Sequence, residues 1–146
     1  MNELATDVFQ EVDVEHRELE EKYEVIHAAI AAGPSALTSV CNRLTDLAVD
    51  LERHFANEEE AGYFTEIIEM APHLSHRAEL LEAEHEQLLR QLRELQRHVA
   101  ASTDCAQKYE LLCRIIPGFI AACRKHEHCE TELIQEAWLT DIGVGD

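Results

Sequence analysis

Apolar residues recur every three or four positions in four long stretches of the chain. These stretches cover about residues 3–32, 35–58, 73–101 and 105–139. A period of this length is typical of amphipathic α-helices that bury one face. The second stretch shows it most clearly, because Leu44, Leu47 and Leu51 lead to His54 and Glu58 in steps of three and four residues. The pattern therefore predicts four helices that face a common interior.

Short breaks separate the four predicted helices. Gly33-Pro34 ends the first helix and begins the second, because proline is favoured in the first turn of a helix. Ser102-Thr103-Asp104 provides a turn and an N-cap for the fourth helix. Between Glu58 and Pro72 the helical pattern weakens, and we expect an irregular continuation to about Met70. Long helices with short connections predict an all-α fold, an up-down-up-down four-helix bundle.

Composition agrees with this fold and limits the function. The chain of 146 residues contains only 5 Gly and 3 Pro, and we expect residues 1–146 to form a single domain. The net charge of −18 makes nucleic acid and anionic membranes unsuitable partners. The sequence lacks a signal-peptide pattern and a membrane span, and its 5 Cys lack the spacing of a disulfide framework. These features predict a soluble cytoplasmic protein with reduced thiols.

The apolar residues that recur along one face of a predicted helix form its apolar stripe. Six polar residues occupy positions where these stripes would continue. They are His16 in the first helix, His54 and Glu58 in the second, His85 in the third, and His126 and Glu130 in the fourth. Any one of the four histidines alone would more simply be a hydrogen-bonded core residue. All six polar residues in matched positions would be costly to bury without partners, whereas imidazoles and carboxylates are good metal ligands. We therefore predict a buried metal centre.

The spacing of these residues divides the site into two similar halves. His16 precedes His54 by 38 residues, His85 precedes His126 by 41, and each second histidine has a glutamate four residues later. We expect one ion at His16 and His54 and another at His85 and His126, with the two glutamates bridging them. Imidazole and carboxylate ligands favour iron, with manganese and zinc as possible substitutes. An oxo, hydroxo or water bridge would complete a di-iron centre, with positions open to O2, NO or peroxide.

The level of the site along the bundle agrees for the first three helices, since Glu58 lies 14 residues before Pro72 and His85 lies 13 residues after it. His16 lies 17 residues before Gly33 and His54 lies 20 residues after Pro34, so the two share a level to within about one turn. The fourth helix fits this level less well. We expect a longer loop around Thr103 and a kink at Pro117 to absorb the difference.

Residues near the six predicted ligands allow two interpretations each. Cys123 and Cys129 could act in redox chemistry or as auxiliary ligands, or be small buried hydrophobic residues. Tyr23 could hydrogen-bond a ligand or pack in the core, and His27 could replace one of the predicted ligands or take no part in the site. The acidic neighbours could hold imidazole N–H groups or remain solvated. These acidic neighbours are Glu15, Glu59 and Glu84.

Each predicted helix carries one short motif around its polar position. The motifs are Glu15-His16-Arg17-x-Leu19, His54-Phe55-x-x-Glu58-Glu59, Glu84-His85-x-x-Leu88 and His126-x-x-x-Glu130. Together they resemble the hemerythrin-like (HHE cation-binding) family, and the resemblance spans the whole chain. It implies a four-helix bundle around a non-haem di-iron centre.

Two positions differ from the oxygen-carrying members of that family. Those members have a second histidine where this chain has Leu81, and a fourth-helix aspartate at longer spacing where this chain has Glu130. The resemblance is closer to the intracellular branch, which includes iron sensors and di-iron proteins linked to nitrosative stress. It implies a protein that binds or turns over O2, NO or peroxide in oxidative or nitrosative stress. The alternatives are a non-enzymatic module that senses, stores or carries iron or O2, and a helical interaction protein with a vestigial site.

Overall fold

The computed structural model of the chain describes residues 3–143, which contain only helices and turns. The helices are α1 (Glu3–Ala31), α2 (Leu37–Ala61), α3 (Tyr63–Met70), α4 (Ser75–Ala101) and α5 (Cys105–Asp141), with short 3-10 turns at Pro34–Ala36 and Pro72–Leu74. The predicted all-α class is therefore confirmed. None of the helices within this range is long and apolar enough to cross a membrane.

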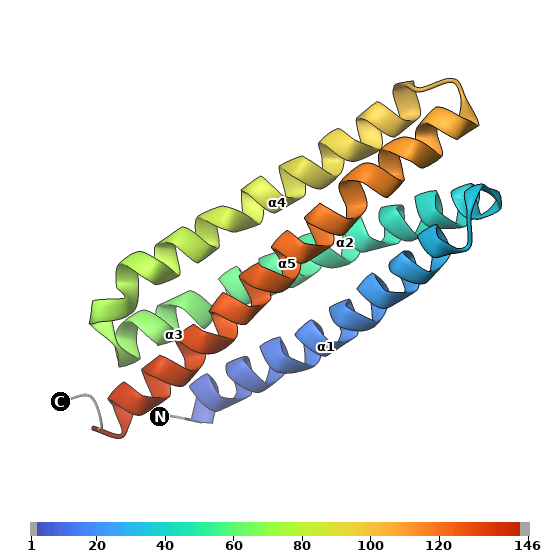
Figure 1. The fold of residues 1–146 in the computed structure, drawn as a ribbon. Helices are drawn as coiled ribbons and strands as arrows, with labels where there is room; N and C mark the ends of the chain where they lie inside the picture. The colour runs from blue at the N-terminus through green and yellow to red at the C-terminus, as the bar shows by residue number, and fades with distance from the viewer. Residues whose placement is uncertain (1–2, 144–146) are drawn as a thin grey trace.

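The four long helices lie side by side in a bundle (Figure 1). Each runs in the opposite direction to the long helix before it, so that α1 and α2 form one hairpin and α4 and α5 form another. The short helix α3 joins the two hairpins at the end of the bundle where the chain begins. This arrangement lets one face of every long helix contribute to a shared interior.

The segment after α2 is more regular than the sequence predicts. Gly62 ends α2 with φ at 89°, in the left-handed region that favours glycine. The chain then continues as a separate helix, α3, because the backbone N–H of Glu66 donates to the Gly62 carbonyl at 2.8 Å. Tyr63 and Ile67 are fully buried, so this helix packs one side against the bundle. The expected irregular continuation to Met70 is therefore wrong.

The connection between α4 and α5 is short rather than long. It spans residues 102–104, and the side chain of Asp104 caps α5 by accepting a hydrogen bond from the Ala106 N–H at 2.9 Å. The expected longer loop around Thr103 is thus wrong, and α5 runs without a break through Pro117. Cys105, which continues the apolar stripe in the sequence, is exposed because it is the first residue of α5, at the end of the bundle.

The buried apolar residues form two clusters, one toward each end of the bundle. The larger cluster includes Leu47, Leu92 and Ile116 and lies toward the two hairpin turns. The smaller cluster includes Val8 and Ile67 and lies around α3. The polar positions singled out in the sequence fall between the two clusters along every long helix. Packed side chains therefore close both ends of this polar layer.

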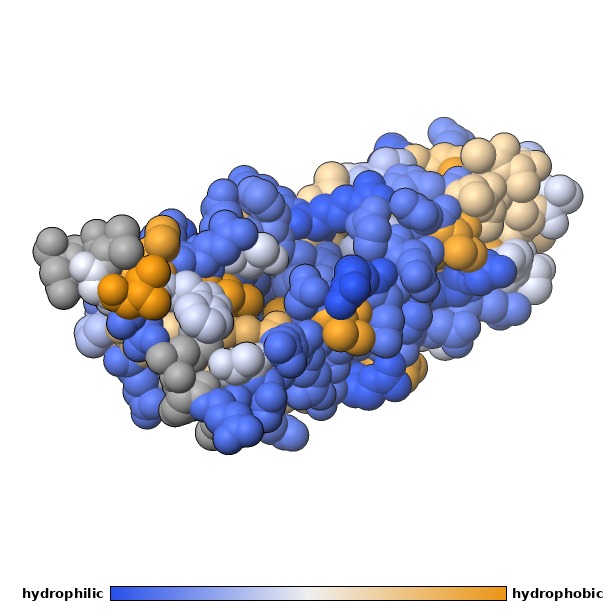
Figure 2. Space-filling view, turned by 90° about the horizontal axis from the view of Figure 1, so that it is seen from below, coloured by the Kyte–Doolittle hydropathy of each residue, from blue (hydrophilic) through white to orange (hydrophobic). Residues whose placement is uncertain are grey.

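Polar residues cover much of the outer surface. Figure 2 shows one largely hydrophilic face, on which strongly apolar residues stand apart from one another. The exposed large apolar residues include Val14, Val25, Val49 and Trp138. Scattered residues of this kind are ordinary at protein surfaces. The features that need a functional explanation therefore lie inside the bundle.

Candidate metal centre

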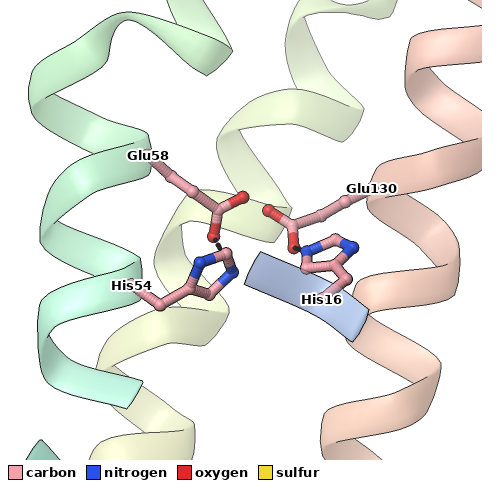
Figure 3. Close-up of side chains that lie close together, drawn as sticks. All are labelled: His16, His54, Glu58 and Glu130. Atoms are coloured by element: carbon pink, nitrogen blue, oxygen red, sulfur yellow. Dashed lines mark hydrogen bonds and ion pairs between the residues drawn. The ribbon is translucent and has the colours of Figure 1, made fainter. Parts of the chain in front are cut away.

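All four long helices contribute side chains to the polar layer. These are His16 from α1, His54 and Glu58 from α2, His85 from α4, and His126 and Glu130 from α5. Figure 3 shows the carboxylates of Glu58 and Glu130 facing each other, with His54 and His16 beside them. The His16 side chain is 11% exposed, whereas those of the other three histidines are only 2–3% exposed. The fold thus brings all six residues together.

The six residues form two groups of possible ligands that share the two glutamates. One group is His16, His54, Glu58 and Glu130, and the other is Glu58, His85, His126 and Glu130. In each group, one ligand atom from every residue lies within 4.8 Å of the ligand atoms of the others. Ligands that share one ion at ordinary bond lengths lie up to about 4.5 Å apart. The division of the histidines between the groups is the one the sequence predicts.

Most of the buried atoms at the centre lack a hydrogen-bond partner. Among the described residues, these atoms are Nε2 of His54, His85 and His126, both carboxylate oxygens of Glu58, and Oε2 of Glu130. Leaving a buried polar atom unsatisfied costs about 1–3 kcal/mol. Six such atoms in one small volume are far more than an ordinary core contains. Metal ions would satisfy all of them, so the residues present fit a metal centre.

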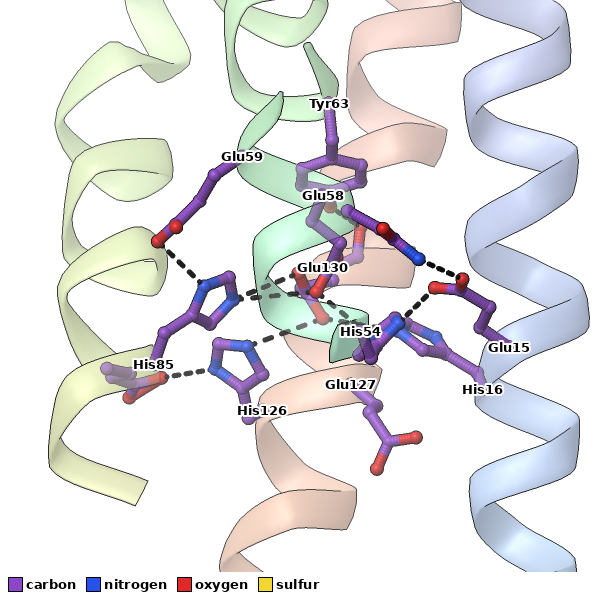
Figure 4. A network of polar contacts seen from close by, with 12 residues as sticks. Glu15, His16, His54, Glu58, Glu59, Tyr63, His85, His126, Glu127 and Glu130 are labelled. Carbon is purple, nitrogen blue, oxygen red and sulfur yellow. Dashed lines mark hydrogen bonds and ion pairs between the residues drawn. The ribbon is translucent and has the colours of Figure 1, made fainter. Parts of the chain in front are cut away.

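A carboxylate stands behind each of the three well-buried histidines (Figure 4). The contacts to histidine Nδ1 are Glu15 with His54, Glu59 with His85 at 3.3 Å, and Glu84 with His126 at 3.0 Å. Glu15 is itself held by the Asn57 side-chain amide, which donates to it at 3.0 Å. Such a carboxylate keeps the ring proton on Nδ1 and leaves Nε2 free for a metal ion. Of the two interpretations of these glutamates, the structure favours the one that holds the imidazoles.

Glu58 and Glu130 share a proton when no ion is bound. Burial, together with the neighbouring charge of Glu58, raises the pKa of Glu130 well above its ordinary value. Burial also acts to raise the pKa of Glu58, but the close contacts with Glu130 and His54 and the charge of His54 outweigh burial and lower this pKa to about 2. The two carboxylates thus act in opposite senses, with a bound proton favoured on Glu130 and negative charge favoured on Glu58.

Burial and the glutamates set the charge of the histidines. Burial lowers the pKa of His16 to about 4 and that of His85 to about 3. Burial also acts to lower the pKa of His54, but the contact with Glu58, the hydrogen bond with Glu15 and the negative charges of both glutamates outweigh burial and raise this pKa to about 9. His16 and His85 are thus neutral at pH 7, whereas His54 must lose a proton before it can bind a metal ion.

Aromatic side chains pack against the histidines of α4 and α5. The Phe55 ring stacks on His85 with a centroid distance of 4.0 Å and meets the edge of His126 at 5.7 Å. Tyr63 donates its hydroxyl to a backbone carbonyl of α5 at 2.7 Å. Neither residue was assigned a role from the sequence, although Phe55 belongs to the motif that begins at His54. Phe55 lies one position beyond a predicted ligand, and Tyr63 lies in the segment expected to be irregular.

A second buried polar group lies on the side of the larger apolar cluster. Tyr23 donates its hydroxyl to Glu127 Oε2 at 3.0 Å, and the Cys123 thiol lies beside the same hydroxyl. Burial raises the pKa of Glu127 to about 7 and, with the charge of Glu127, that of Cys123 to about 12. The sequence analysis missed Glu127. Its spacing could have predicted its burial, because Glu127 lies four residues after Cys123 and three before Glu130, at the edge of the inward face.

The other alternative ligands do not join the centre. Cys123, Cys129 and His27 belong to neither group of possible ligands among the described residues. All five cysteines are free thiols. Because its pKa is about 12, Cys123 stays protonated at neutral pH and is a poor nucleophile and metal ligand. The structure therefore favours a packing role for Cys123.

The comparisons with known proteins give one match. The family model described as the Hemerythrin HHE cation binding domain matches residues 7–138. No curated protein and no solved structure matches the chain. The matched range includes both groups of possible ligands and most of every long helix. The chain therefore belongs to the hemerythrin HHE cation-binding domain family.

Proposed function

We propose that the protein holds two iron ions and uses them to bind or turn over O2, NO or peroxide. The observation that carries this proposal is the cluster of buried imidazole and carboxylate atoms without hydrogen-bond partners. These atoms belong to two groups of four residues that share Glu58 and Glu130. Each group would hold one ion, and the two shared glutamates would bridge the pair, within an up-down-up-down bundle of four helices.

The ligand set favours iron over other metals. Two imidazoles with carboxylates suit iron, while manganese and zinc are the competitors. Thiolates would instead favour zinc or copper, and none of the free cysteines joins either group of ligands. Bound iron would supply one-electron chemistry and open coordination positions for a small oxidant.

The residues of the chain would hold the ions, orient the ligands and exclude water. The three glutamates behind the histidines keep each ring proton on Nδ1 and aim Nε2 at the centre. The apolar clusters at both ends keep bulk water away from the polar layer. Leu81, where α4 could carry another histidine, is instead buried in the smaller cluster. It would leave one position on the neighbouring ion free for a small ligand.

The surface and the thiols suggest where the protein works. The net charge of −18 repels nucleic acid and anionic membranes, so we propose that its partner is the small ligand itself. The five free thiols fit the reducing cytoplasm. Stress protection in that compartment is consistent with a centre open to NO or peroxide.

Metal analysis after loading with ferrous iron tests the proposal. We expect two iron ions per chain in the unaltered protein and a clear loss in His126→Ala. His128→Ala is the matched control, because its side chain is 71% exposed on the same helix. A chain that binds no iron, or that loses iron equally in the two variants, would overturn the proposed centre.

Activity assays on the loaded protein then separate the enzyme from the carrier. The absorption spectrum under O2, peroxide decay and NO consumption are measured on the same preparation. Turnover of peroxide or NO favours an enzyme. Reversible spectral change under O2 without turnover favours a non-enzymatic module that senses, stores or carries iron or O2.

A further inference from the structure

The glutamates behind the histidines follow one order around the bundle. In each case, a glutamate next to one proposed ligand contacts the histidine of the next long helix. Glu15 follows this rule with His54, Glu59 with His85, and Glu84 with His126. The two halves of the chain match Glu58 with Glu130, so the position equivalent to Glu59 is residue 131, where a fourth carboxylate would stand behind His16.

The order breaks at this fourth position because residue 131 is a threonine. The Thr131 hydroxyl turns back to its own helix and donates to the Glu127 carbonyl at 3.1 Å. The side-chain contact of His16 lies on its other face, where Nε2 is 3.2 Å from Glu130 Oε1. Within residues 3–143, His16 is thus the one proposed histidine ligand without a carboxylate on Nδ1.

A hollow of about 260 Å³ between α1 and α5 reaches His16 and is lined by Thr131. Two other hollows reach His54 and His126, but Glu15 and Glu84 line those and hold the histidines. His16 therefore borders open space, and no carboxylate that contacts it lines this hollow.

The acidic side chains of this hollow are already engaged. Glu20 accepts two hydrogen bonds from the Arg124 guanidinium, at 2.9 and 2.7 Å. Glu127 accepts the hydrogen bond of Tyr23 at 3.0 Å. Neither glutamate contacts His16, so no neighbour replaces the carboxylate that residue 131 lacks.

Packing also separates His16 from the other histidines. Phe55 lies against the rings of His54, His85 and His126. The ring contact of His16 is with His54 alone among the described residues, at 5.1 Å between centroids. Its side chain is 11% exposed, against 2–3% for the other three. Hydrogen bonding, aromatic packing and burial thus all leave His16 the least constrained ligand.

We infer that His16 is the ligand that detaches most readily. The ion that it would hold would then exchange with solvent through the hollow between α1 and α5. The inference rests on the proposed metal centre and deepens it. The ion at His85 and His126 is retained, because a carboxylate and an aromatic ring constrain each of these histidines. One retained and one exchangeable divalent cation would let the protein respond to the supply of ferrous iron without unfolding.

Release of iron to a chelator tests this difference. The full chain is loaded with ferrous iron without oxygen and mixed with an excess of a colour-forming ferrous chelator. We expect two phases of one ion each, with rates that differ by about tenfold or more, because losing an orienting partner weakens metal binding by about 10–100-fold. His16→Ala is expected to retain one ion, released at the slow rate.

Substitutions at residue 131 test the cause of the difference. Thr131→Glu supplies the missing carboxylate, and we expect it to slow the fast phase by about tenfold. Thr131→Val is the matched control, which removes the hydroxyl and leaves the fast phase unchanged. Glu59→Gln is expected to speed the slow phase, because it weakens the support of His85. Thermal unfolding of each metal-free variant shows whether it is folded.

The outcomes separate this inference from the metal centre itself. Two ions that leave the unaltered chain at one rate would overturn the inference and leave the centre standing. A fast phase that persists in His16→Ala would also overturn it. If Thr131→Glu does not fold, two measurements still test the inference. They are the rates of iron release from the unaltered chain and the number of iron ions retained by His16→Ala. A chain that binds no iron overturns the centre and the inference together.

Discussion

The Phe55 ring lies almost parallel to the imidazole of His85, with centroids 4.0 Å apart and 7° between the ring planes. Phe55 belongs to the larger apolar cluster and is only 3% exposed. One side chain therefore packs the core and also limits how a proposed metal ligand can turn. Packing of this kind holds a ligand in position before an ion arrives, which lowers the cost of binding.

Phe55→Leu should weaken metal binding more than its effect on packing alone explains. We expect a loss of about 1–2 kcal/mol in the free energy of unfolding, because a buried ring is replaced by a smaller apolar side chain. Phe119→Leu is the control, since Phe119 is buried in the same cluster. Chemical denaturation and iron titration of both variants make the comparison. Equal losses of metal affinity would show that the stacked ring does not support His85.

The apolar period predicted the inward face of each long helix because burial of a helix follows its 3.6-residue turn. It correctly placed His54, His85 and His126 among the buried residues. The apolar period wrongly places Cys105 on the buried face, because periodicity carries no information about where a bundle ends. The regular helix from Tyr63 was also missed, since Gly62 stops one helix and starts another in a single residue.

The partners of the predicted ligands were harder to predict than the ligands. Glu127 and Phe55 sit one position beside the stripes and are nevertheless buried. The contact of Tyr23 with Glu127 joins residues 104 positions apart. Such a contact depends on the rotation and spacing of two helices, which a periodic pattern does not specify.

Glu58→Ala should remove far more metal than Glu59→Ala. Glu58 is 1% exposed and belongs to both groups of possible ligands, so we expect the variant to lose both ions. Glu59 contacts only the outer nitrogen of His85, so we expect affinity for one ion to fall by about 10–100-fold. Glu60→Ala, exposed on the same helix, is the control. Metal analysis after dialysis decides, and equal losses in Glu58→Ala and Glu59→Ala would mean that the inward face of α2 is misassigned.

Metal affinity should rise as the pH increases from 6 toward 9. Without metal, the pKa of His54 is about 9, so His54 holds a proton at neutral pH, and the raised pKa of Glu130 favours a second bound proton. An ion must displace these protons, and a lower proton concentration therefore favours binding. His85, with a pKa of about 3, is already neutral and adds no dependence in this range.

Titrations in a buffer that does not bind metals measure this dependence. Each displaced proton should raise the affinity by about tenfold per pH unit. Proton release on loading in weak buffer gives an independent count of the displaced protons. An affinity that stays constant from pH 6 to 8 would contradict the assigned protonation of Glu130 and His54.

Glu130→Gln should stabilise the metal-free chain while removing its ability to hold metal. Glu130 is fully buried beside Glu58, and the pair must retain a proton that two isolated carboxyl groups would lose. A glutamine of nearly the same shape donates a permanent N–H to Glu58 and carries no charge, which should add about 1 kcal/mol and raise the Tm by roughly 3 °C. Thermal unfolding and metal analysis are measured together, with Glu130→Ala as the variant that leaves a cavity. A metal-free Glu130→Gln chain no more stable than the unaltered metal-free chain would show that the buried carboxylates do not destabilise the bundle. A higher Tm with lost metal would show that this chain keeps a costly buried pair because metal binding requires it.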